Sequence, residues 1–124
     1  MKYVILIYSN PESREIWANM PAEQRRTGLE AYEALNLELE ASGELIVTEA
    51  LVEPSRAKRV SVFEGRTVTS DGPFPEAKEL LGGFYLVDCD SEERATEIAA
   101  RIPEAYLGLV ELRPVLDSLE DFLA

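Results

Sequence analysis

The sequence contains no histidine, and this absence removes several classes of active site at once. A serine or cysteine triad needs a histidine base, and every histidine-ligated metal site is ruled out as well. The only cysteine, Cys89, cannot form a disulfide within the chain. It lies between Asp88 and Asp90, whose negative charge disfavours the reactive thiolate. We therefore expect no metal site and no cofactor, and we expect the chain to reside in a reducing cytoplasm.

Basic residues are scarce, with 12 Lys and Arg against 24 Asp and Glu, which gives a formal net charge of −12. A field of this sign repels nucleic-acid phosphates and anionic membrane surfaces. Long apolar runs are lacking too, because the first one, Tyr3 to Tyr8, is too short for a signal-peptide core or a membrane span. We therefore expect neither a nucleic-acid partner nor a membrane partner.

The composition that remains is that of one globular domain over residues 1–124, with 46% hydrophobic and 29% charged residues. Runs of β-branched, aromatic and alternating residues predict strands over 2–8, 44–52, 57–63, 66–69, 82–88 and 109–115. Helical spacing predicts a helical region from Glu12 to Ser42, interrupted at Pro21 and capped by Gly43, and a second helix from the N-cap Ser91 to Ile102. A terminal helical turn is expected over 117–123.

The order of these elements contains two strand–helix–strand halves, which is typical of an α+β, ferredoxin-like split βαβ fold with an antiparallel sheet and helices on one face. Residues 3–8 and 84–87 are apolar on both alternating sets of side chains, and two amphipathic helices cover only one set. We expect a second copy to cover the other face, as a homodimeric closed barrel. Burial of the order of 1,000 Å² of apolar surface would contribute roughly 25 kcal/mol before the cost of association.

The densest local pattern is Asp71-Gly-Pro-Phe-Pro-Glu-Ala-Lys-Glu-Leu-Leu-Gly-Gly-Phe84, whose paired glycines enter a strand and there permit a close backbone approach. This segment resembles the motif of the DGPF family within the YCII-related proteins. Four further segments sit in the family's order, so the resemblance covers nearly the whole chain: 1–8, 41–45, 100–103 and 110–115.

The resemblance implies a dimeric α+β barrel and a cytoplasmic bacterial protein. It supplies no activity, because the histidine–aspartate pair suggested for some YCII-related proteins has no counterpart in a chain without histidine. Relatives are often encoded beside extracytoplasmic-function sigma factors, which implies a regulatory setting and a sigma-factor association as one alternative.

Five side chains are candidates for a site. Asp71 would serve as a general base if burial raised its pKa, and as a turn residue otherwise. Lys78 and Arg113 would bind an anion or form ordinary ion pairs. Alternation along the last strand places Glu111 and Arg113 on one face, where they would point into the barrel and group with Asp71. Tyr85 is the candidate pocket hydroxyl.

Three functions stay open on this basis. The leading one is a small dimeric barrel that binds an apolar or amphipathic small molecule between sheet and helices, oriented by Asp71, Lys78 and Arg113. The second is a cofactor-independent oxygenase or isomerase with Asp71 as base and Arg113 steadying an enolate. The third is a regulatory protein whose acidic surface engages a basic partner.

Overall fold

The computed structural model describes residues 1–123. Its helices, 3₁₀ turns (η) and strands are, in chain order, β1 (Lys2–Ser9), α1 (Pro11–Asn19), α2 (Ala22–Ser42), β2 (Leu45–Ala50), η1 (Pro54–Arg56), β3 (Lys58–Phe63), β4 (Arg66–Asp71), β5 (Leu80–Asp88), α3 (Glu92–Ala100), η2 (Pro103–Leu107), β6 (Val110–Pro114) and η3 (Leu119–Leu123). The predicted helices are confirmed, including the interruption at Pro21 between α1 and α2. Helix α1 begins one residue earlier than predicted, at Pro11, and α3 ends at Ala100 instead of Ile102. The terminal turn is a 3₁₀ helix.

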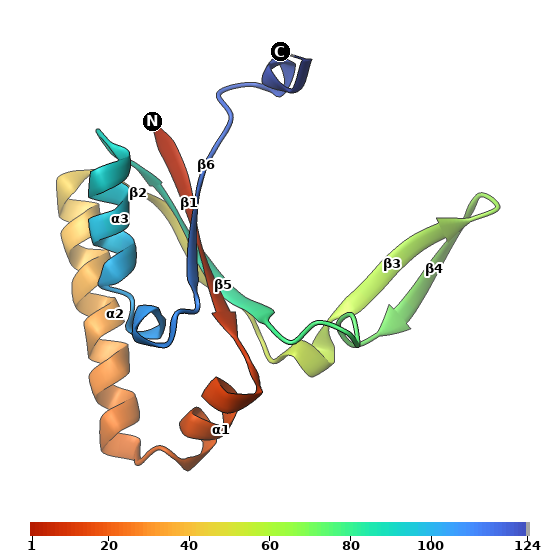
Figure 1. Ribbon diagram of the computed structural model, residues 1–124, viewed down its shortest axis with the longest axis horizontal. Coiled ribbons are helices and arrows are strands. Elements are labelled where there is room, and N and C mark those ends of the chain that lie inside the picture. The colour runs from red at the N-terminus through yellow and green to blue at the C-terminus, as the bar shows by residue number, and fades with distance from the viewer. Residues whose placement is uncertain (124) are drawn as a thin grey trace.

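Four strands form one antiparallel sheet in the order β2-β5-β1-β6. Strands β1 and β2 are connected through α2 and are separated in the sheet by β5, while β5 and β6 are connected through α3 and are separated by β1. This is the split βαβ arrangement, so the α+β fold class is confirmed. Helices α2 and α3 lie side by side on one face of the sheet (Figure 1).

The helix-facing side of the sheet contains the core. Alternate residues of β1 and β5, such as Ile5 and Val87, are completely buried and pack with Leu39 of α2 and Ile98 of α3. Burying one side chain of this size contributes roughly 1.5–3 kcal/mol. The helices are held at their ends by local bonds: Ser91 accepts a hydrogen bond from the third residue after it, and Gly43 ends α2 at a φ of 80°.

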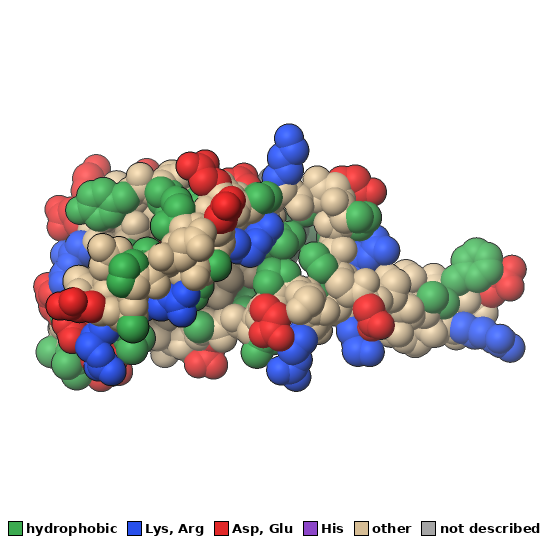
Figure 2. All heavy atoms as spheres, turned by 90° about the horizontal axis from the view of Figure 1, so that it is seen from below, with side chains coloured by type: hydrophobic (Ala, Val, Ile, Leu, Met, Phe, Trp, Pro, Cys, Tyr) green, Lys and Arg blue, Asp and Glu red, His purple; other side chains and the backbone are tan. Residues whose placement is uncertain are grey.

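Strands β3 and β4 form a separate two-stranded sheet, which we call the arm, and it projects from the body of the molecule (Figure 1 and Figure 2). The sequence suggests that strand 57–63 continues a meander from strand 44–52, and this is wrong. Strand β2 pairs with β5, whereas Pro54 in η1 redirects the chain so that β3 pairs only with β4. The two-residue turn Glu64–Gly65 connects β3 to β4, with φ of 49° and 77°.

Candidate functional site

The face of the sheet opposite the helices, which we call the open face, is apolar along its centre. Val4 lies between Leu86 of β5 and Arg113 of β6, and Leu6 lies opposite Phe84 of β5. The apolar side chains of this centre are half-buried, although no helix within the described residues lies over them: Val4, Leu6, Phe84 and Leu86. The open face is therefore an apolar surface over which no helix of the described residues packs.

Glu111 and Arg113 lie at the β6 edge of the open face. Strand β6 alternates as predicted: Val110 and Leu112 pack against the core, whereas Glu111 and Arg113 are exposed on the other side. The Tyr8 hydroxyl donates a hydrogen bond to Glu111 Oε1 at 3.0 Å. Burial, together with this bond, raises the pKa of Tyr8. Arg113 forms no ion pair among residues 1–123.

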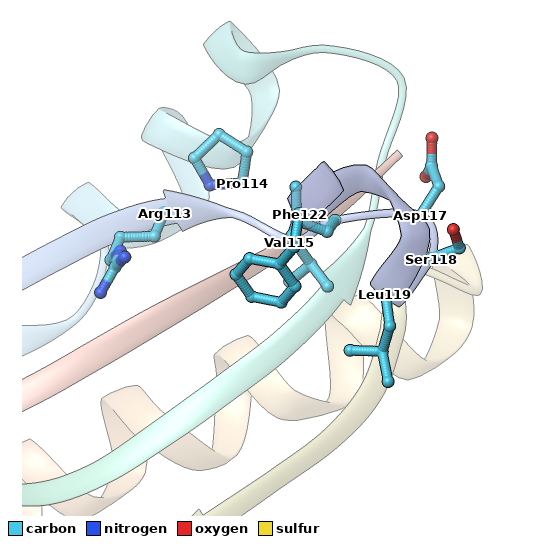
Figure 3. Close-up of a pocket in the computed structure, with 8 residues that line it drawn as sticks. Arg113, Pro114, Val115, Asp117, Ser118, Leu119 and Phe122 are labelled. Carbon is cyan, nitrogen blue, oxygen red and sulfur yellow. The ribbon is translucent and has the colours of Figure 1, made fainter. Parts of the chain in front are cut away.

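A pocket of about 680 Å³ begins at Arg113 and continues along the C-terminal segment. Its walls are built from consecutive residues of 113–119 together with Phe122. Figure 3 shows Arg113 on β6 at one end of the pocket, with Leu119 and Phe122 on η3 at the other. The exposed fractions of Leu119 and Phe122 are 82% and 73%, so one protomer leaves the apolar side of this pocket in solvent.

Asp71 and Lys78 lie away from this edge. Asp71 ends β4 in the arm, where its side chain is 87% exposed and one oxygen is 3.6 Å from Lys58 Nζ. Lys78 is exposed in the loop between β4 and β5. The predicted grouping of Asp71 with Glu111 and Arg113 is thus not formed within one chain, because the arm extends away from the sheet instead of folding over it.

Tyr85 belongs to the helix-facing side, and the sheet separates it from Glu111 and Arg113. Its side chain is 1% exposed, and its hydroxyl donates a hydrogen bond to Oδ1 of Asn36 on α2. The Tyr85 ring is stacked on Tyr32, with 6.5 Å between the centroids. Burial raises the pKa of both phenols, so both remain protonated donors.

The polar contacts around Tyr85 were missed by sequence reasoning. Tyr32 donates a hydrogen bond to Glu104 Oε1 at 2.5 Å, and this contact joins α2 to η2 across a separation of 72 positions. The available signal was Asn36, which directly follows the buried Leu35 of α2. The role of Tyr8 was also missed, although it continues the alternation of Val4 and Leu6.

The space between sheet and helices does not provide the ligand cavity that the sequence reasoning expected. Core side chains fill it, among them Ile5, Leu35, Leu39 and Ile98, each at most 1% exposed. The 680 Å³ pocket lies beside the C-terminal segment, and a second pocket lies at the base of the arm. Both lie outside the helix-facing core, whose side chains are closely packed.

Residues 1–123 contain no group of three or more cysteine or acidic side chains arranged to hold a metal ion. Cys89 is buried, and its burial is the main cause that raises the pKa of its thiol, with Glu44 as a smaller contribution. The sequence argument for an unreactive thiol therefore named the wrong main cause, since it relied on the neighbouring aspartates. Within the described residues, no helix has the length and apolar character to cross a bilayer.

Comparison with known proteins gives matches that extend over nearly the whole chain. A family model described as the YCII-related domain matches residues 1–118. Uncharacterized protein R00369 from Rhizobium meliloti (strain 1021) is 32% identical over 117 residues, which cover 93% of this chain and 92% of the relative. Among solved structures, 5-chloro-2-hydroxyhydroquinone dehydrochlorinase (TftG) from Burkholderia phenoliruptrix AC1100, in complex with 2,5-dihydroxybenzoquinone, matches with 14% identity and a TM-score of 0.48, covering 95% of this chain and 96% of that one.

Proposed function

The chain belongs to the YCII-related family, and from the geometry of its open face we propose that two copies associate through this face and bind a small amphipathic molecule bearing an acidic group. The carrying observation is that the apolar centre of the open face is covered by nothing in residues 1–123, while Arg113 stands at its edge. A two-fold arrangement would cover both faces at once.

The charged pair on β6 explains why a ligand belongs in this proposal. Association would desolvate Glu111 and Arg113, and a buried charge without a partner is strongly destabilising. Glu111 already accepts the hydrogen bond from Tyr8. Arg113 therefore needs an external acceptor, and a carboxylate attached to an apolar body fits a basic group at the border of an apolar face.

Asp71 has no part in this proposal as a catalytic base. A carboxylate becomes a useful base at neutral pH when desolvation raises its pKa. The Asp71 side chain is 87% exposed and lies beside Lys58, so it lacks the burial that such a base requires. Lys78, in the loop that follows β4, is a second basic group for the ligand or the partner copy to meet on association.

Association is tested by light scattering at micromolar concentration on the wild type, Leu6→Lys and Leu37→Lys. Leu6 lies on the open face, whereas Leu37 is 68% exposed on α2, so the second variant is a matched control. We expect a dimer for the wild type and for Leu37→Lys, and a folded monomer for Leu6→Lys. A folded wild-type monomer at this concentration refutes the association directly, whether or not the Leu6 variant folds.

Ligand binding is tested by calorimetric titration with decanoate, a simple amphipathic acid. Arg113→Gln should weaken binding about tenfold or more, because it removes a charge-assisted hydrogen bond. Arg66→Gln at the tip of the arm should leave the affinity unchanged, since it removes the same charge far from the open face. Equal affinities for the two variants would show that Arg113 does not receive the acid.

A further inference from the structure

A second pocket, of about 450 Å³, lies at the base of the arm. Three segments form it: residues 51–59 after β2, the loop residues that follow Gly72, and the start of β5. Its walls are mostly apolar, with Leu51, Val52, Pro54, Ala57, Pro73, Phe74, Ala77, Leu80 and Leu81. A volume of this size accommodates a small organic molecule.

The loop at this pocket is fastened to the arm by backbone hydrogen bonds. The Gly72 N–H donates to the Ala57 carbonyl at 2.7 Å, and the Ala77 N–H donates to the Phe74 carbonyl at 3.1 Å. Gly72 has a φ of 85°, a conformation that a side chain would strain. The Asp-Gly-Pro-Phe sequence thus serves to place the Phe74 ring beside the first residues of β3.

Arg59 brings a buried polar atom without a partner to this pocket. Its guanidinium lies 5.2 Å from the centroid of the Phe74 ring, within the range of a cation–π contact. Its Nε is buried and has no hydrogen-bond acceptor among residues 1–123. The Arg59 guanidinium also forms no ion pair among residues 1–123, so its terminal nitrogens are available to an acceptor from outside the chain.

The charges that line the pocket restrict what that acceptor is. Arg56, Lys58 and Arg59 are basic, and Lys58 is shared with Asp71. Glu53 and Glu79 line the same pocket and oppose an anion of high charge density, such as phosphate. A single carboxylate on an apolar or aromatic body satisfies Arg59, contacts the apolar walls and limits repulsion from the two glutamates.

We propose that the pocket at the base of the arm is a binding site for an aromatic or similarly apolar monocarboxylate. The carboxylate accepts hydrogen bonds from the terminal nitrogens of the Arg59 guanidinium, and the apolar body packs beside Phe74. Arg56 supplies additional positive charge at the same wall. The site shares no lining residue with the apolar centre of the open face, because its part of β5 is Leu80 and Leu81 and none of its lining residues belongs to β1 or β6.

The test is a calorimetric titration of the wild-type protein with benzoate, alongside benzyl alcohol and inorganic phosphate. Arg59→Gln should weaken benzoate binding about tenfold or more. Arg59→Lys should also lose most of the benzoate affinity, because an ammonium lacks the planar guanidinium donors. Phe74→Leu should weaken benzoate binding severalfold.

The control variant is Arg66→Gln. Arg66 begins β4 in the same arm, carries the same charge and does not line the pocket. Its substitution should leave the benzoate affinity unchanged. Benzyl alcohol and phosphate should each bind much more weakly than benzoate, because one lacks the carboxylate and the other lacks the apolar body.

Three results would overturn the site. The first is that the wild-type protein shows no saturable benzoate binding. The second is that Arg59→Gln binds benzoate as tightly as Arg66→Gln does, and the third is that the wild type binds phosphate as tightly as benzoate. Light scattering on Arg59→Gln separates a further case: if this variant loses association while its benzoate affinity is unchanged, the missing acceptor comes from a second copy and the ligand site is refuted. Loss of association in Leu6→Lys, by contrast, should leave benzoate binding intact.

Discussion

The paired glycines at the start of β5 differ sharply in the room around them, and this difference predicts opposite effects of the same substitution. A Cβ on Gly83 would lie 2.9 Å from the Glu49 carbonyl oxygen of β2, whereas a Cβ on Gly82 would lie 3.6 Å from the Ile7 carbonyl oxygen. The first contact is too short for a carbon atom beside a backbone oxygen, and the second is an ordinary van der Waals contact. Gly83→Ala therefore requires β2 and β5 to separate locally.

The magnitude follows from two opposing terms. Forcing an extra methyl group into a packed site costs typically about 1–3 kcal/mol. Replacing glycine by alanine also restricts the unfolded chain, which stabilises the fold by about 0.4–1 kcal/mol. Gly83→Ala should thus lower the free energy of unfolding by about 1–2 kcal/mol, and Gly82→Ala should leave it unchanged or raise it slightly.

The assay is thermal and urea unfolding of both variants and the wild type at one protein concentration, because association makes apparent stability concentration-dependent. At this chain length, about 1 kcal/mol shifts the midpoint temperature by roughly 3–6 °C. Gly83→Ala should unfold several degrees below Gly82→Ala. Equal midpoints for the two variants would refute the claim that Gly83 is required for the close approach of β2 and β5.

Two further predictions concern polar contacts. Glu44 accepts two hydrogen bonds from Arg94, from Nε and from a terminal nitrogen, both at 2.9 Å, and these bonds lower the pKa of Glu44. At neutral pH, the free energy of unfolding of the wild type should therefore exceed that of Glu44→Gln by about 1–2 kcal/mol, as measured by urea unfolding. The difference should shrink as the pH falls below about 4, because the carboxylate is then protonated. Tyr85→Phe should cost about 1–3 kcal/mol because it leaves Oδ1 of the half-buried Asn36 without its donor. Tyr106→Phe, at 90% exposure, should be neutral in the same measurement.

The helices and the central strands could be predicted because their signals are local. The interruption at Pro21, the left-handed Gly43 and the N-cap Ser91 each depend on residues within one turn of the chain. The arm could not be placed in the same way. The alternation in 58–63 predicts a strand but not its partner, and the chain direction after Pro54 decides that β3 leaves the sheet.

The site was predictable in the same uneven way. Alternation alone placed Glu111 and Arg113 on one face of β6, because side-chain period two holds for any strand. Asp71 could not be placed from the sequence, since its position depends on the direction of the arm. Tyr85 was assigned as a pocket residue, yet the register with β1 turns it toward the helices.

Both proposed sites depend on an arginine without an acidic partner in a chain that contains many acidic residues. With 24 acidic and 12 basic residues, the chain has many internal acceptors for each arginine. Even so, Arg59 keeps a buried Nε without an acceptor although Glu53 and Glu79 line the same pocket. Arg113 likewise forms no ion pair within residues 1–123 although Glu111 shares its strand face. In so acidic a protein, arginines left unpaired beside apolar surface favour acceptors that arrive from outside the chain.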